Sequence, residues 1–177
     1  MCIRDRALRE QPIASAERAV ALAPDLGDAH VALGNVRSWL LQDFVGAGVE
    51  FDRALALAPG SADVQRYAAD YLAEMVHFEP AFVAVQRAVN LDPQGYRSYF
   101  QQAVVFYKAR RYSEALAAAR HAQALQPGST DVGRMLSEFL FVSGQVDQAR
   151  QLLETPTTTI GERDRVQICL LYTSRCV

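Results

Sequence analysis

The sequence predicts an all-α protein, an α-solenoid of stacked antiparallel helix pairs, from two regularities. The first is a proline that returns every 34 or 35 residues, at Pro24, Pro59, Pro93 and Pro127. The second is the similar apolar segment that precedes each proline, such as residues 53–58, which read Arg-Ala-Leu-Ala-Leu-Ala. Self-similarity at such a period is typical of solenoids, in which each repeat packs only on its neighbours. The pattern therefore favours a binding function over catalysis.

Prolines and glycines mark where the expected helices begin and end. The prolines end the second helix of each pair, because a residue before proline is pushed away from α geometry. The glycines Gly60, Gly95 and Gly128 follow closely and serve the turns. Pro80 falls in the first turn of a helix, where a missing N–H costs nothing. In chain order, we expect helices at 12–22, 27–41, 44–57, 61–75, 78–91, 95–109, 112–125, 129–143 and 146–154.

Small residues recur where two helices of a pair must approach closely. In the first helices they are Gly34, Ala69, Ala103 and Ser137. In the second helices they are Ala47, Ala81, Ala115 and Ala149, and again Ala54, Ala88 and Ala122. Antiparallel helices pack closely only where one presents a small side chain to the bulk of the other. These positions are therefore predicted to form the buried seam of each pair.

The register of the prolines divides the chain into units. The repeat array is expected to span 7–154, in units 7–26 (partial), 27–61, 62–95, 96–129 and 130–154 (incomplete). The unit 27–61 carries one extra residue, which we expect after about Arg37. The run Thr155–Thr159 breaks the pattern. Residues 155–168 are expected to be a linker or the start of a missing downstream region.

Both ends of the chain look foreign to the repeat. Residues 1–6 and residues 169–174 can be encoded by one short DNA element read in opposite directions, and they resemble translated sequencing-library transposon sequence. We therefore expect 1–6 and 169–177 to be artefact, and the natural part to be a fragment of a longer open reading frame. All three cysteines, Cys2, Cys169 and Cys176, lie in these ends. Disulfides and cysteine-ligated metals are accordingly not expected.

Composition narrows the classes of partner. Without the two ends, the chain has 15 basic and 19 acidic residues and shows no clustered basic face, so direct nucleic-acid binding is not expected. No apolar run approaches the roughly 20 residues that span a bilayer. Lys108 is the only lysine, and the arginine- and alanine-rich composition indicates a GC-rich bacterial, metagenomic source. We expect a cytoplasmic location.

No constellation of residues suggests catalysis. The histidines His30, His77 and His121 lie in three different units without metal-ligand spacing, and each is interpreted as a surface or interhelix residue. There is no glycine-rich phosphate loop and no nucleophile elbow. We therefore predict no enzyme activity, no catalytic residue, no metal and no cofactor.

The repeat resembles the tetratricopeptide repeat. The family's Leu-Gly pair stands at Leu33-Gly34, and its Ala-x3-Phe element at Ala47 and Phe51. The usual first-helix tryptophan is replaced, in the four successive units, by His30, Gln65, Tyr99 and Gly133. The resemblance covers nearly all of the natural part. It implies helix pairs stacked into a right-handed superhelix, whose concave groove is lined by the first helix of each pair.

The resemblance also implies which residues would touch a ligand in the groove. Aromatic and arginine residues dominate binding hot spots, which favours a peptide-binding groove. For Phe100 and Tyr107, packing in the interhelix core is an equally good interpretation, and for Trp39 we favour the core. The candidate groove residues are Asn35, Arg66, Asp70, Arg97, Phe100, Val104, Tyr107, Lys108, Arg134, Glu138 and Phe141.

Two functions follow from this interpretation. The first is a non-enzymatic scaffold that binds a protein or peptide partner in the groove. The alternative is a regulatory or sensing module at the C-terminal end of a larger bacterial regulator, because residues 25–34 look like repeats found downstream of winged-helix DNA-binding or nucleotide cyclase domains. Self-association through exposed solenoid ends is expected to be possible for either.

Overall fold

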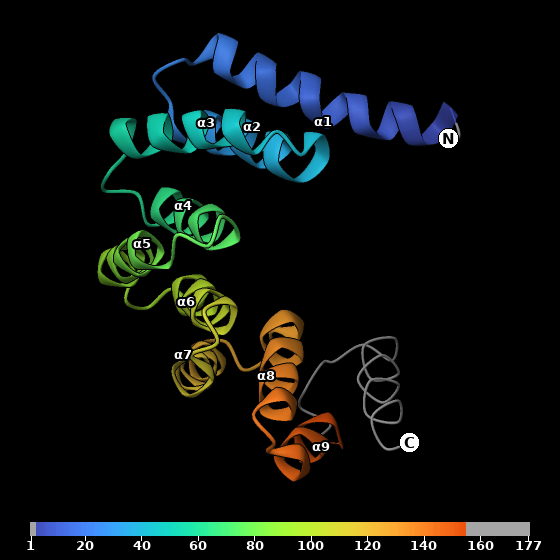
Figure 1. Cartoon of the computed structure of the whole chain (residues 1–177), viewed down its shortest axis with the longest axis vertical. Coiled ribbons are helices and arrows are strands. Elements are labelled where there is room, and N and C mark those ends of the chain that lie inside the picture. Colours follow the sequence, from blue (N-terminus) through green and yellow to red (C-terminus); the bar gives the residue numbers. More distant parts are fainter. Residues whose placement is uncertain (1–2, 155–177) are drawn as a thin grey trace. The chain divides into compact units, whose positions relative to one another are not determined.

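The computed structural model describes the backbone of residues 3–154 and the side chains of residues 10–152. Every regular element in this range is a helix, which confirms the all-α fold (Figure 1). The elements are α1 (Ile3–Leu22), α2 (Gly27–Val36), the π-helical turn η1 (Arg37–Leu41), α3 (Phe44–Leu57), α4 (Ala62–Glu74), α5 (Phe78–Leu91), α6 (Tyr96–Lys108), α7 (Tyr112–Leu125), α8 (Thr130–Val142) and α9 (Val146–Glu154).

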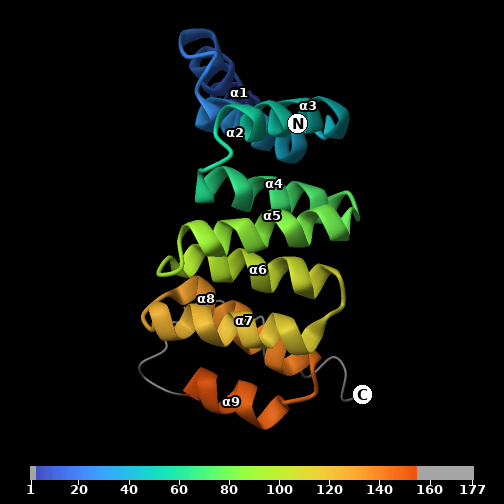
Figure 2. The ribbon, with the colours of Figure 1, turned by 90° about the vertical axis from the view of Figure 1, so that its left-hand side faces the viewer.

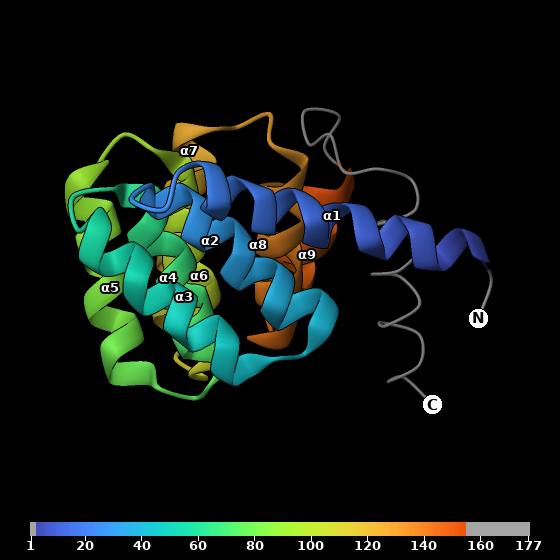
Figure 3. The ribbon, with the colours of Figure 1, turned by 90° about the horizontal axis from the view of Figure 1, so that it is seen from above.

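Contacts divide the chain into two compact units, Met1–Asp92 (unit 1) and Pro93–Val177 (unit 2). In unit 1, α2 pairs with α3 and α4 with α5, while α1 packs on α2 and α4 packs on both α2 and α3. Figure 2 shows α4 and α5 running side by side, and Figure 3 shows the same for α2 and α3. In unit 2, α6 pairs with α7 and α8 with α9, and α7 also packs on α8.

The helix bounds agree with the expected ones to within a residue, with one correction at the N-terminus. The first helix was expected from about residue 12 but begins at Ile3 and continues through Pro12. A proline usually marks a helix boundary, and the repeat pattern gives no signal before it. The expected linker 155–168 and the expected artefact 169–177 lie outside the described residues.

The predicted seam of small residues is buried. Ala47, Ala81 and Ala115 have no exposed surface, and neither do Ala54, Ala88 and Ala122. A Cβ placed on Gly34 would lie 3.1 Å from the Phe51 ring, so this glycine lets α2 approach α3 closely without displacing the ring. Small side chains therefore set the spacing of each pair.

The extra residue of the unit 27–61 lies in the π-helical turn. Each first helix ends at a left-handed residue, and these four residues recur at intervals of 34: Gln42 (φ 55), Val76 (φ 63), Arg110 (φ 60) and Gly144 (φ 80). From Gly27 to Gln42, however, the first helix holds one residue more than its counterparts. A π turn accommodates one additional residue in a helix, and η1 begins at Arg37, where the extra residue was expected.

Candidate functional site

The first helices of unit 1 carry a stripe of polar residues and one tryptophan, which we call the unit-1 face. Its members recur at i, i+7 and i+11 on α2–η1, and at i, i+3, i+7 and i+11 on α4, so each set lies on one side of its helix. The two helices lie next to each other within the unit. The unit-1 face consists of Asp28, Asn35, Trp39, Asp63, Arg66, Asp70 and Glu74.

The candidate residues of unit 1 differ in how firmly they are held. Arg66 donates to Asp63 Oδ1 at 2.8 Å, and its guanidinium carbon lies 4.3 Å from the centre of the Tyr67 ring. Its side chain is only 12% exposed. Asn35 and Asp70 are half-buried. Arg66 is therefore committed to partners within α4.

Trp39 corrects an expectation. We expected its indole in the core, but the residue is 69% exposed and lies in the middle of η1. Its counterpart on α4 is Glu74, which is also exposed, and the buried Ser38 corresponds to the buried Ala73. On both helices, the residue directly after the buried position is exposed. This holds for a tryptophan on η1 as well as for a glutamate on α4.

The first helices of unit 2 carry the remaining candidates, which we call the unit-2 face. Arg97 and Arg134 are exposed, whereas the other members are half-buried. The Arg97 guanidinium lies 6.0 Å from the centre of the Tyr96 ring. The unit-2 face consists of Arg97, Phe100, Val104, Tyr107 and Lys108 on α6, and Arg134, Glu138 and Phe141 on α8.

The apolar members of the unit-2 face also pack on the core. The Tyr107 ring stacks on the buried Phe139 ring at 4.4 Å and 9°, and its hydroxyl makes a long hydrogen bond of 3.5 Å to Glu138. Phe100, Val104 and Phe141 pack against the same core cluster. The sequence left two interpretations open for Phe100 and Tyr107, packing in the core or facing the groove. Each ring packs against the core and keeps part of its surface exposed.

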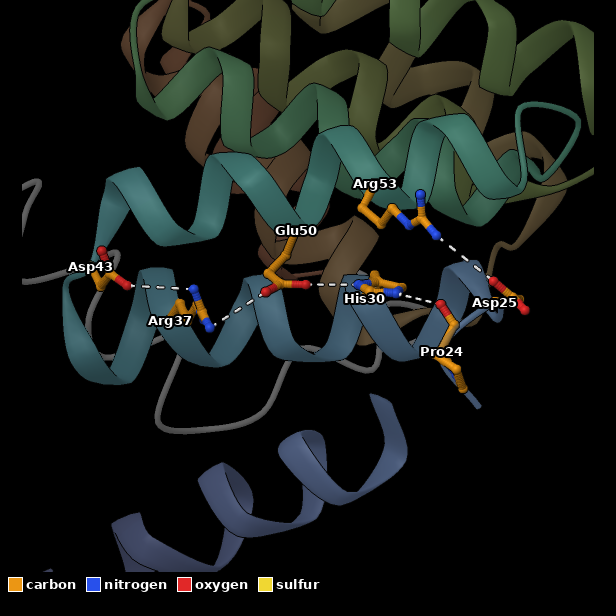
Figure 4. Close-up of polar contacts among 7 residues, drawn as sticks. All are labelled: Pro24, Asp25, His30, Arg37, Asp43, Glu50 and Arg53. Atoms are coloured by element: carbon orange, nitrogen blue, oxygen red, sulfur yellow. Dashed lines mark hydrogen bonds and ion pairs between the residues drawn. The ribbon is translucent and has the colours of Figure 1, made fainter. Parts of the chain in front are cut away.

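A buried polar network joins α2, η1 and α3 in unit 1 (Figure 4). The His30 Nδ1 lies 2.7 Å from Glu50 Oε2, and Arg37 Nη2 lies 3.4 Å from Glu50 Oε1. Arg37 also reaches Asp43, at 3.9 Å. His30 and Glu50 are 7% and 9% exposed. A buried carboxylate is tolerated only when it is paired, and here each of its oxygens has a partner, the His30 ring at Oε2 and the Arg37 guanidinium at Oε1.

His30 also satisfies the turn before its own helix. Its Nε2 donates to the Pro24 carbonyl at 2.9 Å, and Gln65 Nε2 makes the same bond to the Pro59 carbonyl at 2.9 Å. Carbonyls at a helix end lack an intrahelical partner, so a side chain that reaches them stabilises the turn. The Pro24 carbonyl can only accept, so Nε2 is the ring nitrogen that carries the N–H, and Nδ1 is left to face Glu50.

The other two histidines also lie as interpreted from the sequence. The His121 ring contacts the Tyr99 ring with centroids 4.0 Å apart, between α7 and α6, and His77 is exposed before α5. Over the described residues, no group of histidine, cysteine and carboxylate side chains could hold a metal ion. In the same part of the chain, no helix is both long and apolar enough to cross a membrane.

One titratable group stands out beside the α2–α3 pair. Tyr71 stacks on Phe51 at 4.9 Å, and its hydroxyl donates to the Phe44 carbonyl at 2.8 Å. Partial burial raises the pKa of Tyr71 above its usual value, with smaller contributions from the carboxylates of Asp52 and Asp43. The neutral phenol is thus favoured, which suits its role as a hydrogen-bond donor between helices.

Sequence reasoning missed the polar network and the exposure of Trp39, although the register contained signals for both. Glu50 stands where the next two second helices have Ala84 and Ala118, both buried. A charged residue at a position that is otherwise small and apolar indicates a local polar partner. Trp39 stands where α4 and α6 have the charged residues Glu74 and Lys108.

Comparison with known proteins identifies the fold. The sequence model described as tetratricopeptide repeat matches residues 106–167. No curated protein sequence gives a significant match. Among solved structures, the thermophilic tetratricopeptide-repeat protein TTC0263 of Thermus thermophilus superposes with a TM-score of 0.76 at 17% identity, over 97% of this chain and 93% of that one.

Two further structures share the fold. PilF of Pseudomonas aeruginosa superposes with a TM-score of 0.71 at 21% identity, covering 97% of this chain and 80% of that one. YrrB, described as a tetratricopeptide-repeat protein with an unusual peptide-binding site, has a TM-score of 0.60 at 18% identity, covering 99% and 87%. The resemblance inferred from the repeats is thereby confirmed: this chain has the fold of tetratricopeptide-repeat α-solenoids.

Proposed function

We propose that this chain is a non-enzymatic protein–protein interaction module that binds a peptide, or a segment of a partner protein, on its first-helix faces. The observation that carries the proposal is the unit-2 face, where the exposed guanidiniums of Arg97 and Arg134 accompany the half-open rings of Phe100, Tyr107 and Phe141. Arginine and aromatic side chains are the residue types that dominate binding hot spots.

The chemistry of this face favours a particular kind of ligand. A guanidinium binds carboxylates in a planar, bidentate geometry, and the half-open rings offer apolar area without exposing the core. The partner segment is therefore expected to carry acidic groups beside a large apolar side chain. The peptide-binding site described for YrrB is in keeping with such a use of this fold.

The test is a selection from a random peptide library displayed on phage, using the wild-type chain as bait. The double variant Arg97→Glu/Arg134→Glu should lose the selected peptides, because both exposed cations become anions. Both positions are exposed, so the substitutions leave the core intact, as circular dichroism should confirm. Tyr107→Ala is a poorer choice, because its ring stacks on the buried Phe139.

The matched control is Arg87→Glu, the same charge reversal at an exposed position of the second helix α5. It should retain the selected peptides. If the double variant and the control bind them equally well, the unit-2 face is not the binding surface and the proposal fails.

The regulatory module remains a second proposal, supported by the resemblance of residues 25–34 to repeats in bacterial regulators. Long-read sequencing of the gene across residues 7 and 167 tests it. A DNA-binding or cyclase domain encoded upstream would support it, and an upstream reading frame without either would count against it.

A further inference from the structure

Trp39 is an unusual surface residue. It is the only tryptophan in the sequence, and 69% of its surface is exposed. Tryptophan is normally largely buried, because its ring is the largest apolar surface of any side chain. It also lies within a π-helical turn, a feature that frequently marks functional sites.

The π-helical turn that carries Trp39 is held in place by side-chain and backbone contacts of Arg37. Arg37, its first residue, lies 3.4 Å from the buried Glu50 carboxylate and 3.9 Å from Asp43 (Figure 4). The backbone N–H groups of Gln42 and Asp43 both donate to the Arg37 carbonyl, the latter at 2.9 Å. The indole is therefore presented from a fixed backbone, which lowers the entropy lost when a ligand binds.

Charge decides what such an indole would bind. The rest of the unit-1 face contains four carboxylates and a single guanidinium, Arg66, which already contacts Asp63 and the Tyr67 ring. Glu74, the counterpart of Trp39, lies on α4, which packs beside α2. The carboxylates are Asp28, Asp63, Asp70 and Glu74. A face with an excess of carboxylates attracts cations, and a guanidinium that arrives there binds best over a tryptophan ring.

We infer that Trp39 is the contact through which unit 1 binds a basic segment of a partner protein, with an arginine or lysine side chain over the indole. The inference rests on the proposed function and names the partner chemistry for one of its two faces. The carboxylates attract the segment, and the ring fixes where its cation lies.

The experiment uses synthetic peptides and the whole chain. A fluorescently labelled peptide of alternating arginine and alanine is titrated at low salt, with an alternating glutamate–alanine peptide and an alternating leucine–serine peptide of the same length. The arginine peptide should bind and change the emission of Trp39, while the other two should not. Trp39→Leu should weaken the arginine peptide about 2- to 5-fold, the value of an exposed cation–π contact.

Two further variants separate ring from charge. Asp70→Asn/Glu74→Gln should weaken the arginine peptide and flatten its dependence on salt, because screening acts on exposed charges. Val45→Ala is the matched control, since Val45 is an apolar residue of the same unit that is 85% exposed on α3. It should bind like the wild type.

The outcomes distinguish this inference from the proposed function. Equal affinity of Trp39→Leu and wild type for the arginine peptide overturns the inference, as does binding of the leucine–serine peptide alone, which would indicate an apolar partner. Neither result depends on the unit-2 variant Arg97→Glu/Arg134→Glu, which tests the proposed function separately. A response of Trp39 to the arginine peptide supports the inference even if that variant keeps its selected peptides.

Discussion

The α2–α3 pair of unit 1 and the α6–α7 pair of unit 2 place different chemistry at the same three positions. The first pair has His30, Arg37 and Glu50, joined through the Glu50 carboxylate. At the corresponding positions, the second pair has an aromatic and apolar set, Tyr99, Phe106 and Ala118. Both pairs keep the seam of fully buried alanines.

The side chains of the α4–α5 pair are intermediate in polarity between those of the other two pairs. It has Gln65 and Ala84 in place of His30 and Glu50, and Gln65 keeps the bond to the proline carbonyl without a buried charge. The small residues at the seam therefore determine how closely the two helices of each pair pack. The positions beside the seam accept either polar or apolar side chains, provided that each buried polar atom has a partner.

The largest effect is expected from moving the charge of the first pair into the second. Ala118→Glu places a carboxylate at a 7% exposed position where neither His30 nor Arg37 has a counterpart. An unpaired buried charge costs several kcal/mol, so the free energy of unfolding should fall by about 4 kcal/mol. Chemical denaturation followed by circular dichroism measures it. A loss below about 1 kcal/mol would mean that the position is far more open than the structure shows.

The next effect is the reverse change in the first pair. Glu50→Ala leaves His30 and Arg37 facing each other without their shared carboxylate. Removing one partner of a buried ion pair costs about 3 kcal/mol, at the lower end here because the Arg37 side chain is 32% exposed. Denaturation of the variant measures the loss. Asp25→Ala is the control, because its contact with Arg53 at 3.7 Å is exposed and should contribute under about 1 kcal/mol.

A smaller effect tests the seam. Gly34→Ala would place a methyl group 3.1 Å from the Phe51 ring, which also stacks on Tyr71. Overpacking should exceed the gain in helix propensity, for a net loss of about 1 kcal/mol in unfolding free energy. In a Phe51→Val background, which copies Val85 of α5, the same substitution should become stabilising. Destabilisation of equal size in both backgrounds would show that the ring does not limit the spacing.

The smallest effect concerns the turns that end the first helices. Val76 has φ 63, whereas Gly144, its counterpart in unit 2, has φ 80 at no steric cost. Val76→Gly should raise the unfolding free energy by about 0.5 kcal/mol, the left-handed penalty less the added entropy of glycine. Val83→Gly, at an exposed position inside α5, should lower it instead. A loss in both variants would argue against the left-handed turn.

The sequence predicts the helices well because each one is signalled repeatedly. Four copies of a proline turn and of an alanine seam fix the period, and the bounds follow. The single extra residue could be assigned only to a stretch, because a π turn has no residue signature of its own. Its exact place follows from the backbone hydrogen bonds to Arg37.

The candidate site was less predictable, for a physical reason. Positions on the first helices follow from register, but whether an aromatic ring packs or remains open depends on its neighbours in three dimensions. Tyr107 does both, since Phe139 takes one face of its ring. The network around Glu50 joins residues 20 positions apart on two helices, so its only signal in the sequence comes from comparing the repeats, where Glu50 replaces a buried alanine.

The most direct test of this account is a double-mutant cycle on His30 and Glu50. The double variant His30→Gln/Glu50→Ala copies the Gln65 and Ala84 arrangement of the α4–α5 pair. His30 and Glu50 are expected to depend on each other, so that replacing both by the glutamine and alanine of the α4–α5 pair removes the mismatch that Glu50→Ala creates. The double variant should then have a higher free energy of unfolding than Glu50→Ala alone. A coupling free energy of about 1 kcal/mol or more is then expected from chemical denaturation. Losses that simply add would contradict the account.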